Sequence, residues 1–261
     1  MIHTLTNETR KMLIIIWSYR VNVVMWTVFN VAMFSGIALL FGATEGVDRL
    51  QDRPAVLLGF LLTGFANSAI STMAWGLREE AQTGTLEQMT MSPHPVAWLV
   101  LGRLVAEVIV IMIQTSLLAI VVGLLLNFSL PLRIEGLPVL AITIAGLMGF
   151  GFIVGGLTLI YKRMDALANL LTNLLMWVNG TFVAITYFPD WLEAFVRLLP
   201  STQGIIVLRR VMLDGESLAT AWNSGSLGWL MLHSAVALAV GVAVFFWCER
   251  VARQRGTIGQ Y

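Results

Sequence analysis

Long apolar stretches, separated by short polar segments, restrict the fold of this chain more than any other feature. Their approximate bounds are 22–42, 55–76, 96–126, 137–160, 166–187 and 226–248. A helix that crosses the hydrocarbon core of a bilayer needs about 20 mostly apolar residues, and each stretch supplies that length. Charged residues make up 12% of the chain, against roughly 25% in soluble domains. The sequence therefore predicts an all-α, polytopic membrane protein with six transmembrane helices in a single domain, 1–261.

Basic residues predict the orientation of this bundle, because cytoplasmic loops carry an excess of Lys and Arg. When both termini are placed in the cytoplasm, ten Lys and Arg residues lie on the cytoplasmic side and six on the other. Three of those six fall in one long loop, where charge has less influence on orientation. We therefore expect a multi-pass protein of the plasma (inner) membrane with both termini in the cytoplasm.

The segment before the first span also has a membrane pattern. Residues 4–20 combine charged side chains, such as Glu8 and Lys11, with the apolar run 13–17. This composition predicts a helix that lies in the headgroup plane. The apolar run ends at Arg20 instead of a small-residue cleavage site, so we do not expect a signal peptide.

The cytoplasmic loop after the second span has its own amphipathic pattern over residues 77–93. Charged and amide side chains alternate with apolar ones, and Gly84 interrupts the run. Thr85 is suited to cap the turn that follows, where Glu87 lies near the positive end of a helix. Pro93 ends the segment because proline cannot continue a helix. The pattern predicts a short helix parallel to the membrane, although a solvated loop against the headgroups fits the same residues.

The outer loop before the last span, residues 188–212, predicts two short helices. Phe188, Trp191 and Phe195 share one side of the first helix, which Pro200 should end. Ser201 or Thr202 should then cap a second helix through Val207, and Arg209-Arg210 should mark the return to water. The pair is either a helix on the outer headgroups or a half-inserted, re-entrant hairpin that lines the exit of a conduit.

Both loops resemble those of the ABC-2 type transporter permeases, and the resemblance covers nearly the whole chain. The cytoplasmic match is the run of Glu79 and Glu80, then 84–87 (GTLE), then Ser92-Pro93; the outer match is an aromatic-Pro start, a short helix and a Pro-Ser/Thr turn before an Arg. In that family the cytoplasmic loop forms a coupling helix that docks into an ATPase subunit. The resemblance thus implies coupling residues and an outer gate. The expected coupling residues are Glu79, Glu80, Gly84, Thr85, Leu86, Glu87 and Pro93, and the expected gate residues are Phe188, Trp191 and Phe195.

The chain lacks the motifs that ATP-driven or catalytic chemistry needs. No G-x-x-x-x-G-K-[ST] phosphate loop occurs, so we expect no cofactor on this chain, with ATP and Mg bound by a separate ATPase subunit. Because such ATPases work as pairs in the family, the resemblance implies two permeases plus two ATPases. His3, His94 and His233 are scattered, so no metal site is expected. No basic run could neutralise successive phosphates, which argues against nucleic acid as a partner. Membrane lipid is an expected partner because the chain lies in a bilayer.

Polar and aromatic residues inside the spans are the remaining candidates. Arg103 and Glu107 have the i, i+4 spacing of an intrahelical ion pair. A polar path for substrate could use Trp26, Asn30, Asn173 and Trp177, although asparagines in spans also serve as hydrogen-bonding contacts between helices. Gly151 and Gly155 suit close helix packing within the subunit.

We therefore expect a transport subunit and not an enzyme. The first hypothesis is the permease of an ATP-driven exporter that moves a hydrophobic or amphiphilic substrate, drug or lipid-like. Export of a polysaccharide or a lipid-linked glycan is the alternative within the family. A secondary carrier that needs no ATPase ranks below both, and a membrane-embedded enzyme ranks last because no catalytic constellation is present.

Overall fold

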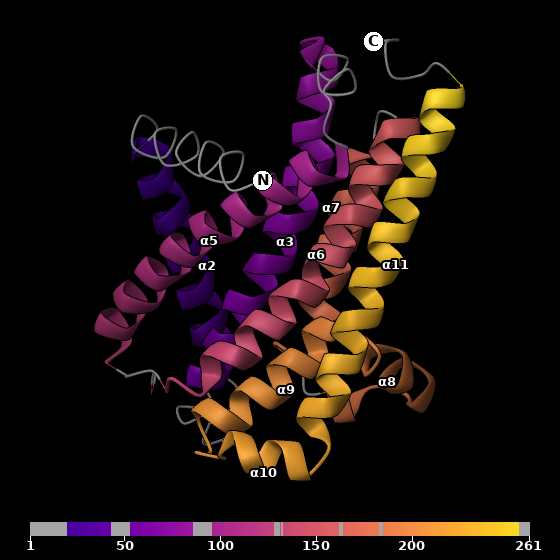
Figure 1. The fold of residues 1–261 in the computed structure, drawn as a ribbon. Coiled ribbons are helices and arrows are strands. Elements are labelled where there is room, and N and C mark those ends of the chain that lie inside the picture. Colours follow the sequence, from indigo (N-terminus) through magenta and orange to yellow (C-terminus); the bar gives the residue numbers. More distant parts are fainter. Residues whose placement is uncertain are drawn as a thin grey trace.

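The computed structural model describes residues 20–42, 53–85, 96–127, 131, 133–161, 164–182 and 185–255, and these residues form helices joined by turns (Figure 1). The long helices are α3 (Arg53–Gln82), α5 (Val96–Leu126), α6 (Gly136–Tyr161) and α11 (Ser226–Gln254). The shorter ones are α2 (Arg20–Gly42), α7 (Asp165–Val178), the 3-10 turn η1 (Ile185–Tyr187), α8 (Asp190–Val196), α9 (Pro200–Met212) and α10 (Leu218–Asn223). The interfacial helix expected at 4–20 lies outside the described residues except for Arg20.

Four of the six expected spans are long and apolar enough to cross a membrane, namely those in α3, α5, α6 and α11. The first stretch forms α2 with nearly the expected bounds, but its described apolar part, Val23–Gly36, is shorter than a span. The structure therefore confirms an all-helical membrane protein, with four candidate spans among the described residues.

The expected fifth span is wrong as a continuous helix over 166–187. Helix α7 has 14 residues and rises about 21 Å, which is less than the ~30 Å core of a bilayer. The chain turns at Gly180, whose φ of 83° favours glycine. The amide nitrogen of Asn179 donates to the Thr63 hydroxyl at 2.8 Å, and its amide oxygen accepts from the Thr181 backbone at 3.0 Å. These hydrogen bonds provide partners for polar groups at the helix break, as irregular backbone inside a membrane protein requires.

Helix α6 lies at the centre of the bundle, between α3 and α11 (Figure 1). A Cβ atom on Gly149 would lie 2.3 Å from the carbonyl oxygen of Ala237, and one on Gly241 would lie 2.2 Å from that of Gly149. The backbones of α6 and α11 therefore touch, as small residues permit in membranes. Gly151 and Gly155 face α3 instead, against Ala69 and Met73, which confirms packing within the subunit.

Helix α9 is buried along most of its length, and three details of the expected hairpin are wrong. Pro200 begins α9 as its first residue instead of only ending the preceding helix, because the first helical position needs no N–H donor. Neither Ser201 nor Thr202 caps it; the cap residue is Leu199. The helix also continues past Arg209, whose guanidinium does not return to water but donates to the carbonyl oxygens of Ala55 and Thr181.

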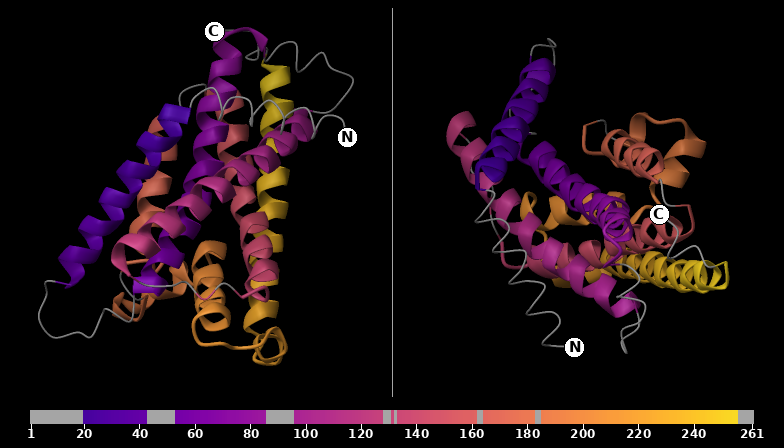
Figure 2. Two further views of the ribbon diagram at one scale, coloured as in Figure 1. Left: turned by 90° about the vertical axis from the view of Figure 1, so that its left-hand side faces the viewer. Right: turned by 90° about the horizontal axis from the view of Figure 1, so that it is seen from above.

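The two ends of the bundle differ. The C-terminal ends of α3, α6 and α11 lie at one end, and α9 and α10 lie at the other (Figure 1). Helix α5 packs against α3 and α6 at the first end, through Val100 and Leu104, and against α2 and α3 at the second, through Leu118 and Val122. Helix α5 therefore diverges from α6 toward the α9–α10 end (Figure 2).

Candidate coupling and transport sites

Two ion pairs tie the last turns of α3 to its neighbours. Arg78 pairs with Asp165 at the start of α7. Two residues later, Glu80 accepts a hydrogen bond from Arg103 of α5, with 2.6 Å between Oε1 and Nη1. The Glu80 and Arg103 side chains are only 20% and 18% exposed. Because both acceptors and donors are charged, these are the stronger class of hydrogen bond, and they connect the end of α3 to two other helices.

The expected pair between Arg103 and Glu107 is wrong, because Arg103 reaches across to α3 instead of along its own helix. Gly76 makes this possible: a Cβ at that position would lie 2.5 Å from the Arg103 guanidinium. Glu107 instead accepts a hydrogen bond from the Ser68 hydroxyl of α3. A carboxylate within a span is costly unless it is paired, and Ser68 supplies that partner.

The turn that follows α3 holds part of the expected coupling segment. The separate helix expected from residue 77 is wrong for residues 77–82, which continue α3 without a break. The backbone turns at Gly84, where φ is 75°. The Thr85 hydroxyl donates to the Glu80 carbonyl at 3.1 Å, so this side chain closes the preceding helix. Glu79, Gly84 and Thr85 are exposed at this end, whereas Leu86, Glu87 and Pro93 lie outside the described residues.

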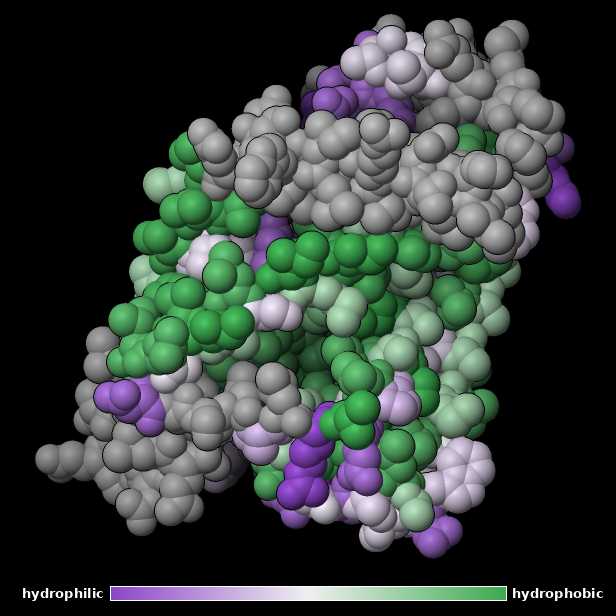
Figure 3. Space-filling view, turned by 60° about the vertical axis from the view of Figure 1, so that its left-hand side comes forward, coloured by the Kyte–Doolittle hydropathy of each residue, from purple (hydrophilic) through white to green (hydrophobic). Residues whose placement is uncertain are grey.

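An apolar groove opens where α5 diverges from α6. Its volume is about 720 Å³, within the range of about 300–1,000 Å³ that ligand pockets occupy. Figure 3 shows the hollow on an apolar face of the molecule, with hydrophilic side chains below it. The lining residues include Leu58, Leu62 and Phe65 of α3, Met112, Thr115, Ser116, Ala119, Ile120 and Leu124 of α5, Leu137 and Leu140 of α6, Leu208 and Met212 of α9, and Arg133. Among the described residues, the groove is thus a hydrocarbon-lined space whose one charged lining residue is Arg133.

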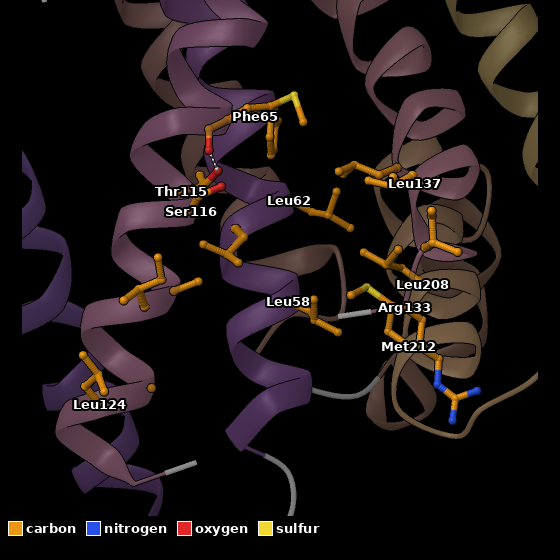
Figure 4. A pocket seen from close by; sticks show the side chains of 18 residues that line it. Leu58, Leu62, Phe65, Thr115, Ser116, Leu124, Arg133, Leu137, Leu208 and Met212 are labelled. Carbon is orange, nitrogen blue, oxygen red and sulfur yellow. Dashed lines mark hydrogen bonds between the residues drawn. The ribbon is translucent and has the colours of Figure 1, made fainter. Parts of the chain in front are cut away.

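The polar groups of the groove are unevenly placed. The Thr115 hydroxyl donates to its own helix, at 2.7 Å from the Ile111 carbonyl oxygen, so it makes no demand on a ligand. The Arg133 side chain extends beyond the apolar side chains, toward the α9–α10 end (Figure 4). No ion pair in the described part of the chain includes Arg133.

Comparison with known protein families assigns the chain to one of them. The model of the family described as ABC-2 type transporter matches residues 5–213, well over half of the chain. This chain belongs to the ABC-2 type transporter family. It is the membrane-embedded permease component of an ABC transporter, and the family implies an ABC ATPase as partner. A comparison with curated proteins gives no match. Helices α10 and α11 of this ABC-2 permease lie beyond the matched region.

The residues expected along a substrate path do not line the groove of this ABC-2 permease. Trp26 is half-buried and packs against two of the buried apolar clusters of the bundle, and the amide of Asn30 donates to its carbonyl oxygen at 2.8 Å. Asn173 and Trp177 lie on the exposed side of α7. Trp177 contacts Phe182, with 5.6 Å between ring centroids. These four residues thus lie on α2 and α7, and none of them lines the groove.

The residues expected at the outer gate also lie apart from the groove. Trp191 and Phe195 are 73% and 59% exposed on α8, and Phe188 is half-buried before it. Helix α8 lies at the edge of the bundle in each ribbon view (Figures 1 and 2). Their exposed aromatic rings suit the headgroup level of a membrane.

Sequence reasoning missed Asp165, Arg133 and the true partner of Arg103. Asp165 could have been found as an acidic residue in the first turn of a helix. The spacing of Arg103 favoured a partner on its own helix, and Gly76 was the signal that a bulky group approaches α3. Arg133 was counted only for orientation, because nothing in its local sequence indicates that a groove ends beside it.

Proposed function

We propose that this ABC-2 permease exports a hydrophobic or amphiphilic substrate, drug or lipid-like, across the plasma membrane. The energy comes from ATP, bound with Mg²⁺ by a separate ATPase subunit. The observation that carries this proposal is the pair of ion pairs at the end of α3. They join the segment that carries Glu79, Glu80, Gly84 and Thr85 to two other helices of the bundle.

The ion pairs suggest how docking of the ATPase alters the bundle. Coupling between two sites requires an element whose arrangements are favoured by different ligand states. The end of α3 meets α7 through Arg78 and α5 through Glu80. A displacement of the exposed turn at Gly84 therefore pulls on both helices at once. Under this proposal the α3 end faces the cytoplasm, where the ten basic residues lie, together with both termini.

A second copy of the chain completes the conduit in this proposal. The exposed side of α7 carries Asn169 and Asn173 between Leu170, Leu174 and Trp177. The Asn173 amide donates to the Asn169 carbonyl oxygen at 2.8 Å within α7, and exposing the remaining amide groups of both side chains to lipid is costly. This mixed surface supports a pairing in which the two α7 helices face one another across a polar path, with two ATPases bound below.

Substitutions at Gly84 test the coupling role of the exposed turn. Valine should be strained there because β-branched residues rarely adopt positive φ, whereas asparagine tolerates this conformation. No atom of the described residues lies within 4 Å of a Cβ at Gly84, so the expected strain comes from the backbone conformation. In vesicles that hold the permease and its co-purified ATPase, we expect Gly84→Val to hydrolyse ATP without substrate efflux and Gly84→Asn to retain both. Normal efflux by Gly84→Val would refute the coupling role.

A further inference from the structure

We infer that the apolar groove between α5 and α6 is a binding site for an anionic membrane phospholipid, with an acyl chain in the groove and the phosphate at Arg133. This site is distinct from the proposed cargo path on α7, and it does not depend on the proposed export.

The shape of the groove fits an acyl chain. Its lining on α5 extends from Met112 to Leu124, which corresponds to about 18 Å along the helix axis. That length is close to half of the ~30 Å hydrocarbon core, the depth of one leaflet. The lining residues of α5 recur at Met112, Ser116, Ile120 and Leu124, so a single face of the helix borders the groove.

The groove also lacks groups that would favour other occupants. No acidic side chain lines it among the described residues, so a cationic amphiphile gains no counter-charge. The Thr115 hydroxyl donates its hydrogen bond within its own helix. A polar sugar or peptide in the groove would therefore find few hydrogen-bonding partners. In a bilayer the surrounding solvent is hydrocarbon, and a lipid chain fills such a space without exposing polar groups.

Arg133 supplies the complement for the headgroup. It precedes α6 at the end of the groove and points past the apolar side chains (Figure 4). Asp214 and Glu216 flank Gly215, which lies next to the Arg133 guanidinium, yet neither forms an ion pair with it in the described part of the chain. An unpaired guanidinium matches a phosphate in charge and in its forked geometry.

Native mass spectrometry of the purified permease complex, reconstituted in nanodiscs with equal phosphatidylglycerol and phosphatidylcholine, tests this inference. We expect phosphatidylglycerol to be retained preferentially on release from the nanodisc. Arg133→Gln should lower its retention roughly tenfold or more, as expected for loss of a charge-assisted hydrogen bond. Arg210→Gln removes an exposed Arg near the same end but outside the groove, and it should leave retention unchanged.

A second pair of variants tests the acyl-chain position without changing charge. Ser116→Phe places a ring in the groove and should reduce retention of both lipids. Leu117→Phe adds a ring on an exposed position that does not line the groove, so it should have no effect. Equal retention of the two lipids by the unchanged protein, or unaltered retention in Arg133→Gln, would overturn the inference. Disulfide formation between two copies carrying Ser116→Cys would also overturn it, because a second chain would then cover the groove.

Discussion

Removal of the carboxylate of Glu80 should lower the stability of the folded permease, whereas the same change at its neighbour Glu79 should have little effect on stability. At an effective dielectric constant of 20, two charges about 4 Å apart attract by about 4 kcal/mol before desolvation is counted. A hydrogen bond to a charged group contributes a net ~1.5–3 kcal/mol. Glu80→Gln keeps a neutral acceptor 2.6 Å from Arg103. We therefore expect Glu80→Gln to lose about 1–2 kcal/mol of folding free energy, around the lower end of that range.

Glu79→Gln is the matched control because Glu79 is an exposed residue of the same helical turn. Exposed charges there contribute roughly 0–1 kcal/mol. Thermal unfolding of each variant in detergent, followed by size-exclusion of the surviving protein, measures the difference. A double-mutant cycle with Arg103→Gln then isolates the pair, and its interaction energy should be near 1 kcal/mol or more. Equal midpoints for Glu79→Gln and Glu80→Gln, or a cycle energy near zero, would refute the reasoning.

Two further predictions concern packing and the helix break. Gly149→Ala should cost about 1–3 kcal/mol, because its Cβ would lie 2.3 Å from the Ala237 carbonyl oxygen, while Gly228→Ala on α11 has open space and should be neutral in the same melting assay. Asn179→Ala should lose about 1–3 kcal/mol by leaving buried groups without partners, whereas exposed Asn173→Ala should lose less; similar losses for the two would contradict the role of the buried cluster.

Apolar composition was sufficient to predict that the protein lies in a membrane and to locate its four long helices. Spans depend mainly on local residue type, because a bilayer excludes charged residues from any helix that crosses it. The cytoplasmic loop 77–93 and the outer loop 188–212 predicted the family through short sequence patterns that include Gly84 and Pro200. Both residues act locally, since glycine permits positive φ and proline fixes the first turn of a helix.

Contacts between distant residues could not be read from local patterns. The stretch after Val178 remains apolar, yet the chain breaks there because Asn179 bonds to Thr63 on another helix. Arg103 pairs with Glu80 on α3 instead of with Glu107, which lies four residues away on its own helix. The groove results from the tilt of α5 relative to α6 (Figure 2), and tilt depends on packing instead of on residue type.

The contact between Gly149 and Gly241 bears on how the protein is made. Roughly ninety residues separate the two glycines, and a ribosome adds about 5–20 residues per second. Helix α6 therefore waits on the order of 5–20 s for its closest neighbour. During that interval its glycine face is open to lipid or to another nascent chain. Biogenesis of the bundle is complete only when the last helix has entered the membrane, so a ribosome that stalls before α11 leaves a partial permease in which the α11-facing side of the central helix is uncovered.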